Sequence, residues 1–248
     1  EEVERGFSAL KWDPFGTAYM EISNRELQAA SEQVGAVRDA VGWGVDLLIE
    51  GHGRFNLPSA LRVAWEMEQY RPYCFEEPVP PDNYGAMAEL KQRCRIPIAA
   101  GERCYTRFDF RDLFEKRAID IAQPDIMHAG GFMECKRIAG MADAYYIPVS
   151  PHNPCGPVAT AIALQFAACT PNFGLLETMA NDVPWRSELT DERLHAEDGY
   201  MYVPDRPGLG IELNYEVFPK YPYSPKTLHH FDGRLTKIRP ENQAVPYF

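Results

Sequence analysis

Three glutamates recur at equal intervals along this chain. Glu50, Glu76 and Glu102 lie 26 residues apart, each at the end of a short apolar run. Converging carboxylates repel one another unless a cation neutralises them, and a ligand set made only of oxygens suits Mg²⁺. We therefore predict that these three residues bind Mg²⁺. The alternative is a structural ion network with Arg54 and Arg103.

Two histidines occupy similar positions after apolar runs. His52 follows Glu50 by two residues, so in an extended segment both side chains would point to one face. His152 follows the run Ile147–Ser150, and Asp125 follows the run before that. A carboxylate that holds one ring nitrogen orients an imidazole and raises its basicity. We predict proton-transfer roles for His52 and for His152 with Asp125. The alternative is that both histidines are structural.

Other polar residues near these positions are candidate contacts for a small molecule. Arg54, Arg103 and Asn153 could bind substrate hydroxyls or a carboxylate. Ordinary ion pairs or helix caps explain the same residue types equally well, so both interpretations stay open.

Short apolar runs alternate with longer amphipathic stretches. Seven runs have the composition of strands buried on both faces: Phe7–Trp12, Val45–Glu50, Tyr73–Glu76, Ile96–Glu102, Ile119–Gln123, Ile147–Ser150 and Phe173–Glu177. Six stretches between them have helical spacing: 23–41, 58–67, Tyr84–Cys94, Arg107–Ala118, Gly131–Tyr146 and Gly156–Cys169. This alternation predicts an α/β fold with a parallel sheet and right-handed crossovers.

Two architectures fit this alternation. An open nucleotide-binding sheet usually carries a glycine-rich turn after its first strand, and no such motif is present. We therefore predict a (β/α)7β-type TIM barrel over residues 1–190, whose strand ends place the metal and catalytic residues in one mouth. The chain begins abruptly with Glu1, so we expect the first barrel strand to lie upstream. Residues 191–248 are predicted to form a C-terminal tail packed on the barrel or on a missing domain.

Composition excludes several classes of protein. The chain has 248 residues and a net charge of −11. Such acidity repels phosphate backbones and anionic membranes, so we expect neither nucleic acid nor a membrane as partner. No apolar run is long enough to be a transmembrane helix. The six cysteines form no C-x-x-C pair, which predicts free thiols in a reducing, cytoplasmic compartment rather than a zinc site.

Taken together, the motifs resemble the enolase superfamily and, more narrowly, its mandelate racemase subgroup. The resemblance covers roughly residues 5–215 and is carried by these segments: 75–78, 99–103, 123–125, 128–131 and 204–210. Within the subgroup, further segments look most like D-galactonate dehydratase-like sugar acid dehydratases: 51–54, 107–110, 138–142 and 151–152.

The resemblance implies a Mg²⁺-dependent hydro-lyase acting on a galactonate-like aldonate. In members of this superfamily a Lys or His base works with Mg²⁺. Here His152, oriented by Asp125, would take the proton α to the carboxylate, and His52 would protonate the departing β-hydroxyl to give a 2-keto-3-deoxy acid. Glu177, in protonated form, would support the second carboxylate oxygen, and Lys11 would contact the substrate carboxylate. The superfamily's N-terminal capping domain is expected to be missing from this sequence.

Two positions depart from the subgroup pattern. Glu50 stands where the first metal ligand is usually Asp, so a longer side chain must reach the same ion. The Lys-x-Lys motif of many members reads Lys11-Trp12-Asp13 here. Losing the second Lys argues against a two-base racemase and leaves histidine as the base.

Other functions remain open. An epimerase or cycloisomerase could use the same proton abstraction on a related sugar acid, and a non-catalytic sugar-acid-binding regulator could use the same scaffold. For an enzyme of this kind we expect a small-molecule sugar acid as partner and a homo-oligomeric assembly.

Overall fold

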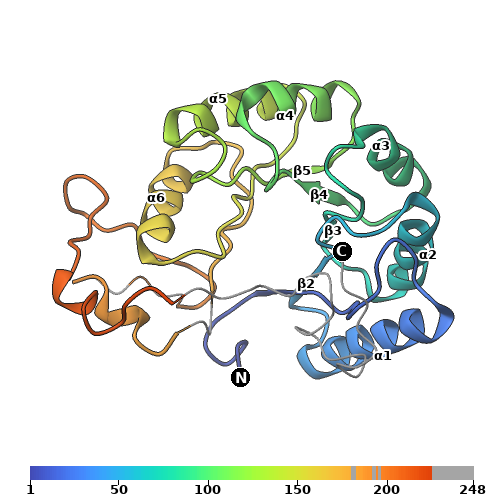
Figure 1. The fold of residues 1–248 in the computed structure, drawn as a ribbon, viewed down its shortest axis with the longest axis horizontal. Helices are drawn as coiled ribbons and strands as arrows, with labels where there is room; N and C mark the ends of the chain where they lie inside the picture. The colour runs from blue at the N-terminus through green and yellow to red at the C-terminus, as the bar shows by residue number, and fades with distance from the viewer. Residues whose placement is uncertain (180–182, 192–193, 195–196, 225–248) are drawn as a thin grey trace. The chain divides into compact units, whose positions relative to one another are not determined.

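The computed structural model describes residues 1–179, 183–191, 194 and 197–224, drawn in colour in Figure 1. These residues form two compact units. The β1–β4 unit contains residues 8–100 and 112–121. The α5–α6 unit contains residues 1–7 and 101–111 and the described residues from 122 onward.

Parallel strands run side by side in chain order in the β1–β4 unit. They are β1 (Ala9–Trp12), β2 (Asp46–Glu50), β3 (Cys74–Glu76) and β4 (Ile98–Ala100). Apolar residues such as Ile49 and Phe75 are buried in this sheet. The register pairs Glu50 with Glu76, so two neighbouring strands both end in a carboxylate.

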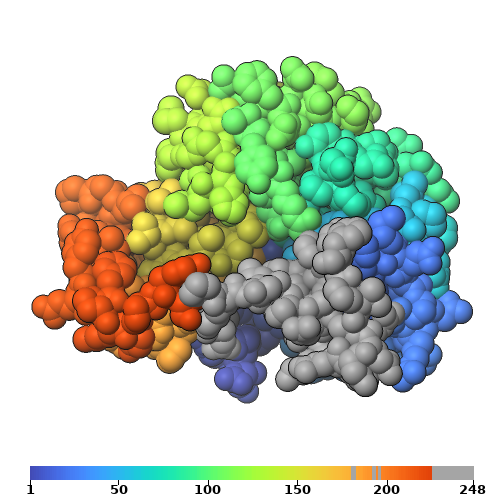
Figure 2. All heavy atoms as spheres, viewed as in Figure 1, coloured from blue at the N-terminus to red at the C-terminus, as the bar shows by residue number. Residues whose placement is uncertain are grey.

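Helices follow the strands, and side-chain caps determine where they begin. They are α1 (Asn24–Val41), α2 (Leu57–Met67), which runs into the short 3₁₀ helix η1 (Glu68–Tyr70), and α3 (Tyr84–Arg93). Ser23 and Glu26 form a capping box on α1, while Asn56 and Asn83 cap α2 and α3 by accepting from backbone amides. Helix α2 packs against α1 and α3, and all three reach the molecular surface in Figure 2.

The α5–α6 unit has fewer regular strands. Helix α4 (Thr106–Glu115) and strand β5 (Ile121–Ala122) each belong partly to both units. The remaining elements are α5 (Phe132–Asp143), α6 (Pro157–Ala168) and the 3₁₀ helices η2 (Arg186–Glu188) and η3 (Tyr215–Val217). Val149 forms parallel bridges with Ala122 and with Phe173.

The structure confirms the six predicted helices and, in shorter form, the first five predicted strands. The predictions of full strands at Ile147–Ser150 and Phe173–Glu177 are wrong, because the described residues there form only single bridges. Pro148 and Pro151 flank this pairing site and lack the backbone N–H that a longer ladder would need.

Part of the predicted tail is described and lies in the α5–α6 unit. Just before this tail, Arg186 donates to the carbonyl oxygen of Cys155 at 2.8 Å and to the Thr160 hydroxyl at 3.1 Å. The Trp185 and Tyr221 rings stack with their centroids 4.6 Å apart. The division at residue 190 stays a prediction, and residues 225–248 lie outside the described residues.

Two findings bear on the expectations from composition. Among the described helices, none combines the length and apolar character needed to cross a bilayer. The six cysteines are free thiols, as predicted. Burial raises the pKa of the Cys135 thiol to about 12 and that of Cys94 to about 11, so both stay protonated near neutral pH.

The turn after β2 depends on a glycine. A Cβ added at Gly51 would lie 2.7 Å from the carbonyl oxygen of Glu77, which is closer than the backbone allows. We predict that Gly51→Ala lowers the free energy of unfolding by about 1–3 kcal/mol, as overpacking does elsewhere. Urea denaturation measures the change.

Gly44→Ala is the matched control, since a Cβ at Gly44 meets no atom within 4 Å. This variant should stay within about 0.5 kcal/mol of the parent protein. Equal losses in both variants would contradict the close approach at Gly51.

Candidate active site

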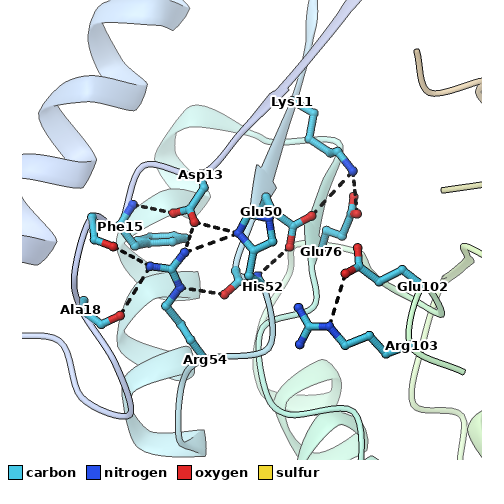
Figure 3. Close-up of polar contacts among 12 residues, drawn as sticks. Lys11, Asp13, Phe15, Ala18, Glu50, His52, Arg54, Glu76, Glu102 and Arg103 are labelled. Atoms are coloured by element: carbon cyan, nitrogen blue, oxygen red, sulfur yellow. Dashed lines mark hydrogen bonds and ion pairs between the residues drawn. The ribbon is translucent and has the colours of Figure 1, made fainter. Parts of the chain in front are cut away.

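Two carboxylates and an ammonium group meet at the ends of strands in the β1–β4 unit. Glu50 and Glu76 are almost completely buried. Lys11, from β1, places its Nζ 2.6 Å from Glu76 Oε1 and 3.6 Å from Glu50 Oε2 (Figure 3). The second carboxylate oxygen of Glu50 accepts the His52 backbone N–H at 2.6 Å. Buried anionic oxygens of this type suit a hard divalent cation such as Mg²⁺.

The backbone after β2 turns sharply. The amide of Gly51 donates to the carbonyl of Glu76 at 2.8 Å, and the amide of Gly53 donates to the carbonyl of Glu77 at 2.6 Å. His52 lies between them with φ of 50°, a left-handed conformation that is uncommon outside glycine. The expectation that Glu50 and His52 share one face of an extended segment is therefore wrong, since the strand ends at Glu50.

The His52 ring contacts the carboxylate of Asp13, a buried residue that directly follows β1. Its Nδ1 lies 2.8 Å from Asp13 Oδ2, and the other Asp13 oxygen accepts the Phe15 amide at 2.9 Å. Arg54 forms an ion pair with the same Asp13 oxygen, as Figure 3 shows. A carboxylate, a guanidinium and an imidazole thus form one connected group.

Arg54 has no solvent-exposed surface. Its guanidinium donates to the carbonyls of Gly51 at 3.0 Å and Gly16 at 2.7 Å, besides pairing with Asp13. This burial favours the ion-pair alternative for Arg54 over contact with a substrate.

The α5–α6 unit holds a second histidine between two acids. His152 Nδ1 lies 2.9 Å from Asp125 Oδ2, and its Nε2 lies 3.2 Å from Glu102 Oε2. Burial alone would raise the pKa of the Asp125 carboxyl. Hydrogen bonds from His152 and from the Met127 amide outweigh this effect and hold that pKa below its ordinary value. Asp125 is therefore a carboxylate near neutral pH and can orient the His152 ring.

The other predicted residues of this unit have close polar partners. Arg103 Nε lies 3.3 Å from Glu102 Oε1. The carboxylate of Glu177 accepts a hydrogen bond from the Asn153 backbone N–H at 2.8 Å. The Asn153 side-chain amide donates to the Glu177 backbone carbonyl at 2.9 Å. Asn153 thus holds both the side chain and the backbone of Glu177 in place.

The structure groups the predicted residues by unit. One group contains Lys11, Glu50, His52, Arg54 and Glu76, and the other contains Glu102, Arg103, Asp125, His152 and Glu177. Their functional roles stay predictions.

The sequence did not predict the contacts of Asp13, which was interpreted only as the residue that replaces the second lysine of the Lys-x-Lys motif. The available signal was its place after the first predicted strand, next to the strand that leads to His52.

Comparison with known proteins assigns the chain to a family. A sequence model of the enolase C-terminal domain-like family matches residues 1–217. The chain is similar to a D-gluconate dehydratase from Thermoproteus tenax, with 37% identity over 229 residues, which are 92% of this chain and 46% of that protein. A D-galactonate dehydratase from Pectobacterium atrosepticum is 36% identical over 87% of this chain and 58% of its own length.

Solved structures agree with this assignment. A mandelate racemase/muconate lactonizing enzyme-like protein from Rubrobacter xylanophilus is 42% identical, with a TM-score of 0.83 over 88% of this chain and 58% of that one. The chain therefore spans about half the length of the relatives it matches.

The depressed pKa of Asp125 links this site to stability. Folding lowers that pKa, so the carboxylate stabilises the protein above the unfolded value of about 3.9, and the stabilisation is lost as pH falls through the folded value. We predict that Asp125→Asn lowers the free energy of unfolding by about 1.5–3 kcal/mol near pH 7. In urea denaturation the deficit should be smaller at acidic pH, below the folded value, where the parent carboxylate is protonated as well.

Asp39→Asn on the exposed face of α1 is the control and should show no such pH-dependent deficit. A deficit for Asp125→Asn that is equally large at both pH values would mean that packing, not ionisation, explains it.

Proposed function

The chain belongs to the enolase C-terminal domain-like family, and from this membership we propose that it is the catalytic part of a Mg²⁺-dependent sugar acid dehydratase. The observation that carries the proposal is the His152 imidazole, held by Asp125 on one side and facing Glu102 on the other. A base oriented by a carboxylate and adjacent to a metal-ligating residue suits removal of a proton α to a carboxylate. The names of the relatives support this reaction class.

We propose that Glu50, Glu76 and Glu102 hold the Mg²⁺. Each offers a carboxylate oxygen, and Glu50 and Glu76 already end neighbouring strands in register. Glu102 follows the next strand of the same sheet by two residues. When bound, the cation would supply positive charge that stabilises the negative charge developing on the substrate carboxylate.

The two histidines carry the proton transfers in this proposal. His152 accepts the α-proton at Nε2, because Asp125 holds Nδ1 and the Glu102 carboxylate, which faces Nε2 here, would bind the cation instead. The electron pair released at the α-carbon expels the β-hydroxyl, which takes a proton from His52 and leaves as water. The resulting enol tautomerises to a 2-keto-3-deoxy acid.

Charged residues bind the substrate carboxylate. Lys11 provides the cation at the Glu50–Glu76 pair. Glu177, in protonated form, donates a hydrogen bond to the second carboxylate oxygen of the substrate, and the Asn153 backbone N–H holds the Glu177 side chain in place. Arg103 lies next to Glu102 and can contact substrate hydroxyls. Arg54 has a positioning role instead, since it is buried.

Finer features follow from the same proposal. The fold type is the (β/α)7β barrel of the enolase superfamily, and the substrate is an aldonate with a galactonate-like configuration. The named substrates of the relatives, gluconate and galactonate, differ in configuration, so a panel of acids is the appropriate probe. The homo-oligomeric state and cytoplasmic location stay predictions.

The experiment is a screen of aldonic and aldaric acids with the purified protein and Mg²⁺. We predict that at least one galactonate-like aldonate gives a 2-keto product, detected by semicarbazide absorbance. His152→Asn should abolish both product formation and exchange of the α-proton in D₂O, because His152 is the base to which that proton is transferred. Metal binding by this variant should persist.

Three outcomes would overturn parts of this account. Product or exchange at the parent rate in His152→Asn would exclude His152 as the base. Proton exchange with epimerisation and no 2-keto product would favour an epimerase. Sugar-acid binding with neither product nor exchange would favour a regulator.

A further inference from the structure

We propose that Asp13 is a positioning residue that determines which nitrogen of His52 transfers a proton. This inference rests on the proposed function, in which His52 is the acid that protonates the departing hydroxyl. Asp13 is buried at the end of β1, and its Oδ2 lies 2.8 Å from His52 Nδ1. The arrangement repeats, in the other unit, the pairing of His152 with Asp125.

The direction of the hydrogen bond follows from what each group can do. An ionised carboxylate only accepts hydrogen bonds, so Asp13 requires a proton on His52 Nδ1. Arg54 Nη2 also lies near that nitrogen, at 3.4 Å, and a guanidinium only donates. Asp13 therefore needs a proton on Nδ1, whereas Arg54 would need a lone pair there. The Asp13 contact determines the protonation of Nδ1, because it is shorter, its acceptor is charged, and Arg54 already pairs with Asp13.

Arg54 keeps Asp13 in the ionised, acceptor-only state. The guanidinium is fully buried and is fixed by the carbonyls of Gly51 and Gly16. Its charge stabilises the neighbouring Asp13 carboxylate, whose other oxygen already accepts the Phe15 amide. Asp13 therefore cannot rotate to present a different group to the ring without losing these partners.

The backbone supports the same orientation. His52 has a left-handed φ of 50°, and the Gly51 and Gly53 amides bind the carbonyls that end β3. A conformation that non-glycine residues rarely adopt persists only where its surroundings hold it, and such positions cluster at functional sites. The loop and the Asp13–Arg54 pair together fix the ring.

The consequence for the reaction is a defined proton path. When His52 donates a proton, the proton on Nδ1 stays bound to Asp13. The proton on Nε2 moves to the departing hydroxyl oxygen, the carbon–oxygen bond breaks, and water leaves. His52 remains as the neutral Nδ1–H tautomer.

The tautomer can be measured directly by ¹⁵N NMR of histidine-labelled protein, with the His52 signals identified by their loss in His52→Gln. We predict that neutral His52 carries its proton on Nδ1 in the parent protein. In Asp13→Asn the amide group can donate to Nδ1, so the proton should move to Nε2. The kcat for dehydration should then fall by about 10²–10⁴-fold with little change in KM, as when a triad aspartate is replaced.

Asp39→Asn serves as the control, since it removes an exposed acid from α1, and it should keep both the tautomer and the activity of the parent. If the parent protein shows His52 protonated on Nε2, the inference is wrong even when dehydration is observed. If the Nδ1–H tautomer is found but no acid is dehydrated, the proposed function fails while the positioning by Asp13 stands. The parent spectrum tests the inference even if Asp13→Asn does not fold.

Discussion

Buried carboxylates are the constraint on which the candidate site depends. An ionised acid removed from water is strongly destabilising unless cations or hydrogen-bond donors compensate it. Lys11 provides this compensation for Glu50 and Glu76 at the ends of adjacent strands. His152 provides it for Asp125, together with a backbone amide. Each acid is therefore fixed in place by the group that balances its charge, and Asp125 in turn orients the His152 ring.

The backbone makes this arrangement rigid. Strands β2 and β3 end in register, and the loop that follows β2 is bonded to carbonyls at the end of β3. Gly51 allows that close approach, and His52 adopts a left-handed conformation as a result. Sites held by strand ends and their first loop residues are more precise than sites on long loops.

Much of this could be predicted from the sequence, because it follows from local patterns. Helical spacing predicted the six helices, and the 26-residue spacing of Glu50 and Glu76 corresponds to their observed register. The conformation of His52 could not be predicted, because it depends on carbonyls of another strand.

The role of Asp13 was missed for a similar reason. Its partner lies 39 residues away, and only the parallel pairing of β1 and β2 brings the two together. The segments around Val149 form single bridges and not the predicted strands, because Pro148 and Pro151 lack the backbone N–H that a longer ladder needs.

The most direct test of the central claim is a calorimetric titration with Mg²⁺ or Mn²⁺. We expect the parent protein to bind one ion per chain. The metal affinity should fall at least about 100-fold in each of the variants Glu50→Gln, Glu76→Gln and Glu102→Gln, because even changes outside the ligand set cost about 10–100-fold. Unchanged affinity in any one of these variants, with the exposed Glu32→Gln as reference, would contradict a shared metal site.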